Sequence, residues 1–201
     1  INGFGWVLLN GIFIHATGAK SLCPPINSYI LTYTQLVIKK IIIWTDASID
    51  TLKICILYKT IVPARISDEL AEKAKTIALQ IADKLQLAGT LCVEMFVAGQ
   101  EILVNEIAPR PHNSGHYSIE ACNFSQFDTH IRGILGEPLP PIRLLSPAFM
   151  INVLGQDMEA AQAFSQENPN AYLHFYGKLE AKHNRKMGHV TVLTDDVEVE
   201  L

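Results

Sequence analysis

The run NEIAPRPHNSGHY, residues 105–117, holds the densest group of reactive side chains in the sequence. It places a carboxylate, an arginine and two histidines directly after the apolar stretch EILV. Arginine and carboxylate groups bind phosphates and metal ions, and histidine exchanges protons near neutral pH. A routine surface turn needs none of this chemistry. The run therefore predicts half of a nucleotide and metal site.

Two prolines, Pro109 and Pro111, fix the backbone angles on either side of Arg110. We expect an extended, stiff segment that suits the positioning of a ligand, and Gly115 would let the backbone approach that ligand closely. A single histidine is more often a structural hydrogen-bonding residue, so two of them favour a functional role without deciding it. The candidate donors to a phosphate, a carboxylate or a heterocycle are Arg110, His112, Asn113, Ser114 and His116.

A predicted hairpin brings two carboxylates together. The strands TLCVEMFV and EILVNEIA flank the short turn AGQ, and a turn centred near Gln100 places Glu94 opposite Glu106. Like charges in that position repel by a few tenths to about 1 kcal/mol, which a divalent cation such as Mg²⁺ would offset. Asn105 offers a further oxygen or a donor to phosphate. The alternative, that one or both acids face solvent, stays open because the register of a turn is uncertain by a residue or two.

A cluster of cations lies near the end of the chain. The segment KLEAKHNRKMGH contains Lys178, Lys182, Arg185 and Lys186 in a chain whose net charge is −4. Such a local cluster fits an anionic ligand, and a phosphate in particular. An ordinary solvated hairpin tip explains the same pattern equally well.

Regular elements can be predicted around these groups. A helix over residues 67–87 is expected to begin with Ser67 as its N-cap and to end before Gly89. Its apolar face would contain Leu70, Ala74, Ile77, Ile81 and Leu85. A second helix is predicted over residues 118–135, stopped by Gly136 and Pro138. A strand over 147–155, a short helix over 157–166 and two strands around the basic segment complete an α+β, or mixed α/β, fold with an antiparallel sheet and packed helices.

Composition excludes several classes of partner. With 201 residues, a net charge of −4 and a pI near 6.0, the chain has no general attraction to nucleic acid or to an anionic membrane. Its four scattered cysteines argue against a zinc site and a disulfide framework, which favours the cytoplasm. The apolar runs of the first 55 residues are shorter than a membrane span, so buried strands or poorly specified segments are the interpretation there.

The later sequence resembles a known family. From about Ile56 to Glu198, the segments VEMFVAGQEILVNEIAPRPHNSGHYSIEAC, SQFDTHIRGILGEPL, SPAFMINVLG and HFYGKLEAKHNRKMGHVTV are similar to the carboxy-terminal part of the 5-(carboxyamino)imidazole ribonucleotide synthases, which are ATP-grasp ligases. The resemblance implies ATP-dependent carboxylation of aminoimidazole ribonucleotide with bicarbonate in de novo purine synthesis, forming ADP and phosphate. It also implies cytoplasmic small-molecule chemistry, no nucleic-acid or membrane partner, and a homodimer as a candidate assembly.

The resemblance implies a role for each matching residue. Glu94 and Glu106 would bind Mg²⁺, with Mn²⁺ as an alternative ion, and Asn105 with Glu106 would contact ATP. Arg110 and His112 would be catalytic, with Arg110 holding the anionic intermediate. The remaining substrate-binding residues, besides His112, would be Asn113 and Ser114, together with Lys178, Arg185 and Lys186 for the ribonucleotide phosphate.

The sequence also departs from the family. The glycine-rich phosphate loop, the lysine for ATP and the Glu-Lys-Glu run of the family do not occur in it. We interpret residues 1–55 as an atypical segment, a truncated or out-of-frame lid region, before an ATP-grasp core at 56–140 and a small β-rich domain at 141–201. An incomplete chain with little activity of its own is expected. The alternative is an inactive remnant that binds the ribonucleotide or associates with a full-length synthase.

Overall fold

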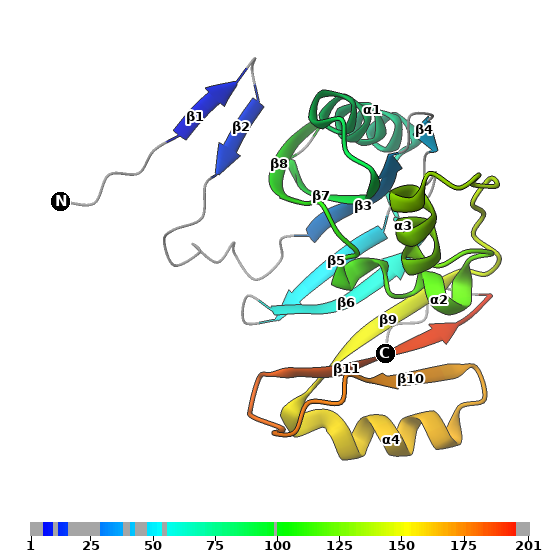
Figure 1. Cartoon of the computed structure of the whole chain (residues 1–201). Helices are drawn as coiled ribbons and strands as arrows, with labels where there is room; N and C mark the ends of the chain where they lie inside the picture. The colour runs from blue at the N-terminus through cyan, green and yellow to red at the C-terminus, as the bar shows by residue number, and fades with distance from the viewer. Residues whose placement is uncertain are drawn as a thin grey trace.

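The computed structural model describes residues 6–9, 12–15, 29–37, 41–42, 48–53, 56–98 and 100–195, with side chains from residue 57 onward. Helices and a large antiparallel sheet form a mixed α/β fold, as predicted (Figure 1). Strands do occur among the first 55 residues, but the predicted burial of their side chains lies outside what is described. No helix in these ranges is both long and apolar enough to cross a membrane.

One sheet of nine strands runs through the molecule, in the order β10-β11-β9-β6-β5-β3-β7-β8, with β4 paired to β3. A separate pair consists of β1 (Trp6–Leu9) and β2 (Ile12–His15). Because β9 pairs with both β6 and β11, the sheet is continuous across residue 141, and the division into two domains there stays a prediction. The strands of the sheet are β3 (Tyr29–Val37), β4 (Ile41–Ile42), β5 (Ser48–Lys53), β6 (Ile56–Val62), β7 (Gly89–Ala98), β8 (Glu101–Ala108), β9 (Ala148–Leu154), β10 (Ala171–Phe175) and β11 (Lys186–Leu193).

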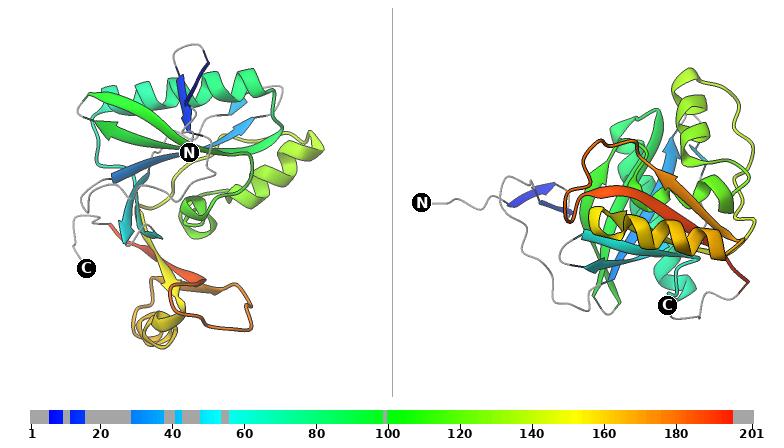
Figure 2. Two further views of the ribbon diagram at one scale, coloured as in Figure 1. Left: turned by 90° about the vertical axis from the view of Figure 1, so that its left-hand side faces the viewer. Right: turned by 90° about the horizontal axis from the view of Figure 1, so that it is seen from below.

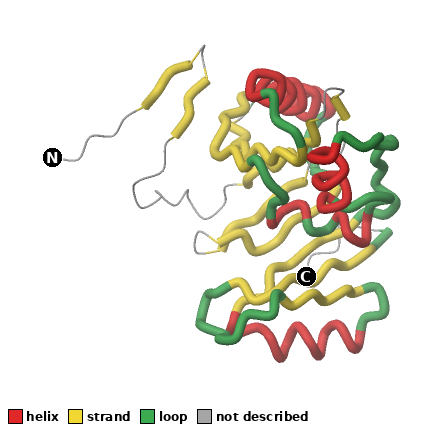
Figure 3. The backbone as a smooth tube through the Cα atoms, in the orientation of Figure 1, coloured by secondary structure: helices red, strands yellow, loops and turns green. Residues whose placement is uncertain are grey.

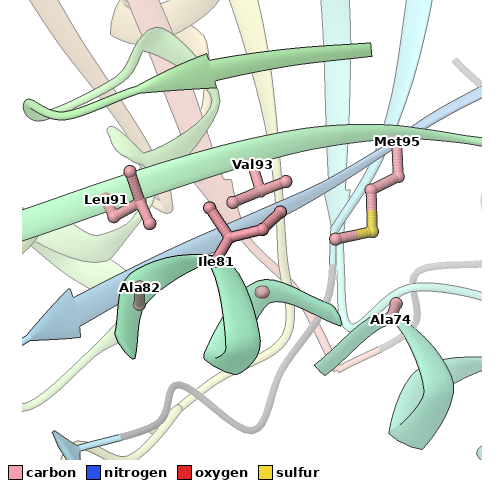
Figure 4. Close-up of a cluster of buried hydrophobic side chains, with 7 residues drawn as sticks. Ala74, Ile81, Ala82, Leu91, Val93 and Met95 are labelled. Carbon is pink, nitrogen blue, oxygen red and sulfur yellow. The ribbon is translucent and has the colours of Figure 1, made fainter. Parts of the chain in front are cut away.

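Helix α1 (Asp68–Leu85) packs against β7 at one end of the sheet. Its N-cap is Ser67, whose hydroxyl accepts a hydrogen bond from the Leu70 amide at 3.3 Å, as predicted. Figure 4 shows the core between the two elements, formed by Ala74, Ala78, Ile81, Ala82, Leu91, Val93 and Met95. Leu85, predicted on the packed face, is instead 49% exposed, because the chain turns at Gln86 in the left-handed region and Leu87 packs against this core in its place.

The predicted helix over 118–135 is wrong in one respect, since the structure has two helices there. Helix α2 (Ser118–Ala121) ends at Cys122, whose backbone is extended, and α3 (Gln126–Leu135) begins after it. Ser125 and Asp128 form a capping box that fixes the start of α3. Between the two helices, the Asn123 side chain donates a hydrogen bond to the Pro141 carbonyl and accepts one from the Arg143 amide. The end of α3 is as predicted, with Gly136 in the left-handed conformation at φ 71°.

The carboxy-terminal elements follow the prediction closely. A short 3-10 helix η2 (Gly155–Asp157) leads from β9 into α4 (Met158–Glu167), and β10 and β11 come after it. Helix α4 packs through Ala161 against Val153, Ala171 and Val190. Figures 2 and 3 show α4 beside β9, β10 and β11, at the opposite end of the sheet from α1. Helices α2 and α3 lie between these ends, where Tyr117 and Ala121 are buried with residues of β6 and β9.

Gly89 at the start of β7 provides a test of this packing. Its φ is +99°, and an added Cβ would lie 2.7 Å from His130 Nδ1, which accepts a hydrogen bond from the Thr90 amide. Gly89→Ala should therefore lower the free energy of unfolding by about 2–4 kcal/mol, measured by urea denaturation. Gly136→Ala is the control, since its φ is also positive but nothing lies within 4 Å of the new atom, and its loss should be about 1–2 kcal/mol. Equal losses would contradict the steric explanation.

Candidate active site

The hairpin of β7 and β8 places Glu94 directly opposite Glu106, as predicted. Ala98 pairs with Glu101 across a two-residue turn, a register that would bring Glu94 opposite Asn105 if it continued. A β-bulge between Glu94 and Met95 shifts the register by one residue. The two carboxylates face each other because of that bulge, and they project from the same face of the sheet.

The two carboxylates have different environments. The side chain of Glu94 is 15% exposed, whereas Glu106 is open to solvent. Glu94 Oε2 accepts a hydrogen bond from Asn105 Nδ2 at 3.2 Å, and Glu94 Oε1 lies 3.3 Å from His112 Nε2. Burial raises the pKa of Glu94, and the charge of Glu106 raises it further, against smaller opposing effects of Asn105, Lys186 and Arg110. The pair is thus a site of accumulated negative charge.

His112 lies over Glu94 in a fixed orientation. Its Nδ1 is 2.8 Å from the hydroxyl of Ser114, and its Nε2 points to Glu94. Burial, together with the smaller effects of the charges of Arg110 and Lys186, lowers the pKa of His112 to about 4, so the ring is neutral at pH 7. If Nδ1 accepts from Ser114, the single proton of the neutral ring is on Nε2, on the side of the carboxylate.

Gln126, at the start of α3, holds the segment that carries His112. Its side chain is fully buried; its oxygen accepts from the His112 amide at 2.9 Å, and its nitrogen donates to the His112 carbonyl at 2.8 Å. An added Cβ at Gly115 would lie 2.5 Å from the Gln126 oxygen. The close approach expected at Gly115 is therefore made to Gln126 and not to a ligand. The sequence analysis did not identify Gln126, although the capping motif SQFD that places it at the start of a helix is present in the sequence.

The basic cluster meets this segment through Lys186. Lys186 Nζ donates to Asn113 Oδ1 at 3.1 Å, and Asn113 exchanges two hydrogen bonds with Asn152 of β9, at 2.8 and 2.6 Å. Lys178 donates to the Lys186 carbonyl and lies over the Tyr176 ring. Arg185 donates to the Glu180 carbonyl within its own loop. Thus Lys186 enters the site directly and Lys178 lies next to it, whereas Arg185 is hydrogen-bonded inside the loop.

Arg110 lies at the solvent edge of the site. It is exposed, and its guanidinium donates to the neighbouring Pro111 carbonyl at 3.1 Å. Its charge is close enough to lower the pKa of both Glu94 and His112. Within the described part of the chain, no set of three or more His, Cys, Asp or Glu side chains is arranged to hold a metal ion. A cation at this site would therefore rest on two carboxylates and on water or ligand oxygens, which is common for Mg²⁺.

A column of stacked rings joins the site to β10 and β11. His116 stacks on His189 with ring centres 4.7 Å apart, and His189 stacks on His174 at 4.8 Å. Tyr176 Oη lies 3.0 Å from His189 Nδ1, and His174 Nε2 lies 2.6 Å from a carboxylate oxygen of Glu120. His116, expected as a donor to a ligand, contributes to this column, and its Nδ1 is 2.9 Å from Gln126 Nε2.

The column should make stability depend on pH. Burial and, to a smaller extent, the neighbouring His174 lower the pKa of His116 to about 4. Burial and, to a smaller extent, His116 lower the pKa of His189 to about 3. Because an unfolded histidine binds its proton near pH 6.5, the stabilising effect is complete above that pH and is lost as the pH falls towards 4. We expect the free energy of unfolding to fall by roughly 1–4 kcal/mol between pH 6.5 and 5.

Urea denaturation at a series of pH values measures this dependence. His189→Asn should flatten the decline, since one of the two histidines of the column with a lowered pKa is removed. His183→Asn is the matched control, because His183 is an exposed histidine of the basic loop. An equal decline in His189→Asn and the wild type would contradict the assignment.

Two protein-family models match separate parts of the chain. Residues 47–127 match the ATP-grasp domain, and residues 148–200 match the phosphoribosylaminoimidazole carboxylase C-terminal domain. The N5-carboxyaminoimidazole ribonucleotide synthase of Staphylococcus saprophyticus is 53% identical over 144 residues, which are 71% of this chain and 38% of that protein. The synthase of Staphylococcus aureus strain MRSA252 is 56% identical over 144 residues, also 38% of its length. The chain thus spans well under half of these relatives.

Solved structures agree. The N5-carboxyaminoimidazole synthetase of Staphylococcus aureus aligns with a TM-score of 0.76 and 47% identity, over 86% of this chain and 47% of that one. The Aspergillus clavatus synthase in complex with ADP and 5-aminoimidazole ribonucleotide aligns with a TM-score of 0.79 and 32% identity, over 86% of this chain and 48% of that one. The aligned 86% of this chain is more than residues 56–201 contain. The structural likeness therefore extends into residues 1–55, which were expected to be unlike the family. The chain belongs to the ATP-grasp family and corresponds to the carboxy-terminal part of the N5-carboxyaminoimidazole ribonucleotide synthases.

Proposed function

We propose that these residues form the metal-binding and ribonucleotide-binding part of a carboxylating ATP-grasp ligase. The reaction is the ATP-dependent carboxylation of 5-aminoimidazole ribonucleotide with bicarbonate, giving the N5-carboxy nucleotide, ADP and phosphate. The observation that supports it most is the continuous set of contacts from Glu106 and Glu94 through His112 and Asn113 to Lys186. It places anion-binding groups beside a carboxylate pair, as phosphoryl transfer requires.

Mg²⁺ fits the carboxylate pair, with Mn²⁺ as an alternative. Glu94 is largely buried beside the like charge of Glu106, and burial and this charge both raise its pKa. Glu94 and Glu106 would hold the ion, while Asn105 and Glu106 would contact ATP. When bound, the ion neutralises charge on the phosphate oxygens. Asn105 also keeps Glu94 oriented, since it donates to Oε2.

Arg110 and His112 are the proposed catalytic residues. Arg110 is exposed at the edge of the site, where its fork of donors would bind bicarbonate or the anionic intermediate derived from it. His112 is neutral and held by Gln126, Ser114 and Glu94, so it can donate from Nε2 without adding charge. Ser114 is buried, and its contribution to substrate binding is the orientation of His112.

The ribonucleotide would bind between Asn113 and the basic loop. Lys186 is held at Asn113, and Lys178 is anchored next to it, which concentrates positive charge for the substrate phosphate. Arg185 would complete this set from the loop. In this arrangement the phosphate lies on the β10–β11 side of the site and the metal on the β7–β8 side.

The chain matches only part of the length of its relatives, and this favours a second candidate function for the 201 residues taken alone. The sequence spans 38% of the matching synthases, so the remaining parts of an ATP site would have to come from elsewhere in a longer protein. By themselves, these residues are proposed to bind the ribonucleotide with little or no turnover. Alternatively, they would be inactive and would associate with a complete synthase.

Replacement of Glu106 distinguishes a metal site from a structural pair. In metal-free buffer, Glu106→Gln should raise the free energy of unfolding by a few tenths to about 1 kcal/mol, because repulsion with Glu94 is removed. With Mg²⁺ the order should reverse, since the wild type gains stability from the ion and the variant does not. Thermal denaturation with and without Mg²⁺ measures both effects. Glu101→Gln, an exposed change on the same strand, is the control; a Glu106→Gln variant that Mg²⁺ still stabilises like the wild type would exclude the site.

Calorimetry tests the proposed function itself. The chain should bind 5-aminoimidazole ribonucleotide, and Lys186→Ala should weaken that binding, whereas Lys84→Ala, at the exposed end of α1, should not. Phosphate release with ATP, bicarbonate and the ribonucleotide should be slow or absent for these 201 residues. Failure of the wild type to bind the ribonucleotide would contradict the proposal, and rapid turnover would contradict the expected inactivity.

A further inference from the structure

The loop between β10 and β11, residues 176–185, is attached to the 3-10 helix η2, which follows β9. Figure 1 shows this loop passing the start of α4, where η2 lies. The Asn184 amide donates to Gln156 Oε1 at 2.9 Å, and Gln156 Nε2 donates to Asn184 Oδ1 at 3.2 Å. The Gln156 side chain therefore makes two hydrogen bonds to Asn184, one to its backbone and one to its side chain, across 28 positions of sequence.

Backbone contact reinforces this fastening. A Cβ built at Gly155 would lie 2.1 Å from the Lys182 carbonyl oxygen and 2.8 Å from backbone atoms of Ala181. Such distances are far below van der Waals contact, and backbone atoms cannot rotate away. Gly155 is thus required for its lack of a side chain, because the loop backbone lies directly on it.

The fastened end of the loop has a constrained backbone. Asn184 has a φ of 61°, in the left-handed region that asparagine enters more readily than most residues. The next residue, Arg185, donates its amide to the Lys182 carbonyl at 3.0 Å. This turn leads straight into Lys186, the first residue of β11, whose side chain lies at Asn113. The conformation at Asn184 therefore sets the direction in which the chain enters β11 at Lys186.

We propose that Gly155 and Gln156 are positioning residues that hold the β10–β11 loop against the sheet and so present Lys178, Arg185 and Lys186 to the phosphate of the ligand. Neither residue belongs to the carboxylate pair or the basic cluster. The identity of the ligand, a ribonucleotide, rests on the proposed function. Four cations within nine residues repel one another, so an unfastened loop would spread and would have to be ordered again on binding.

Gln156→Ala tests the inference with two readouts. The first is limited trypsin digestion, because Lys178, Lys182 and Arg185 are cleavage sites within the loop; cleavage there should become several-fold faster. The second is calorimetry with 5-aminoimidazole ribonucleotide, whose affinity should fall about five- to tenfold. Gln156→Glu keeps an acceptor for the Asn184 amide and should retain part of both properties. Gln162→Ala, an exposed glutamine of α4, is the matched control and should behave as the wild type.

The outcomes separate the two proposals. If the wild type binds the ribonucleotide and Gln156→Ala binds it equally well, or if loop cleavage is unchanged, the positioning role is wrong and the proposed function stands. If the wild type does not bind the ribonucleotide, the proposed function fails, whatever the digestion shows. Faster cleavage together with weaker binding, and partial recovery in Gln156→Glu, supports the inference. Thermal denaturation of each variant confirms that only the loop has changed.

Discussion

The repulsion between Glu94 and Glu106 is the constraint on which the rest of the site depends. A pair of carboxylates facing each other on a hairpin is unfavourable, and burial of Glu94 makes it more so by raising the pKa of that group. The fold nevertheless maintains it with a β-bulge, a hydrogen bond from Asn105 and the overlying ring of His112. A cation bound between the two carboxylates would offset this repulsion, and this is the basis of the proposed metal site.

Long-range contacts make the two halves of the site one unit. Gln126 on α3 fixes the backbone at His112, while Asn152 on β9 fixes Asn113. The stacked histidines carry this order on to β10 and β11, whose connecting loop bears the cations. Burial is the main reason that the pKa of His116 is lowered to about 4 and that of His189 to about 3, so these two rings add no positive charge near Lys186 at pH 7. Charge in the site is therefore concentrated on the carboxylate pair and on the basic groups facing it.

The sequence was most informative where local patterns determine the structure. Alternation and a short turn predicted the hairpin of β7 and β8, and capping residues predicted both ends of α1 to within a few positions. The register at Glu94 came out as expected only because a bulge compensates for a turn shorter than assumed, and no visible pattern marks that bulge. The roles of Gln126 and His189 could not be predicted, since they arise from contacts with residues distant in sequence. The break between α2 and α3 is marked in the sequence by the capping box that begins at Ser125. The prediction of one continuous helix over residues 118–135 missed this signal.

Paramagnetic broadening by Mn²⁺ tests the central claim most directly. In a nuclear magnetic resonance titration of the 201-residue chain, small amounts of Mn²⁺ should first broaden the amide signals of residues 94, 105, 106 and 112, which surround the carboxylate pair. Residues around exposed acids elsewhere, such as Glu72 on α1, should broaden only at higher concentration. Uniform broadening over the acidic surface, with residues 94 and 106 unaffected at first, would contradict a cation site between these two strands.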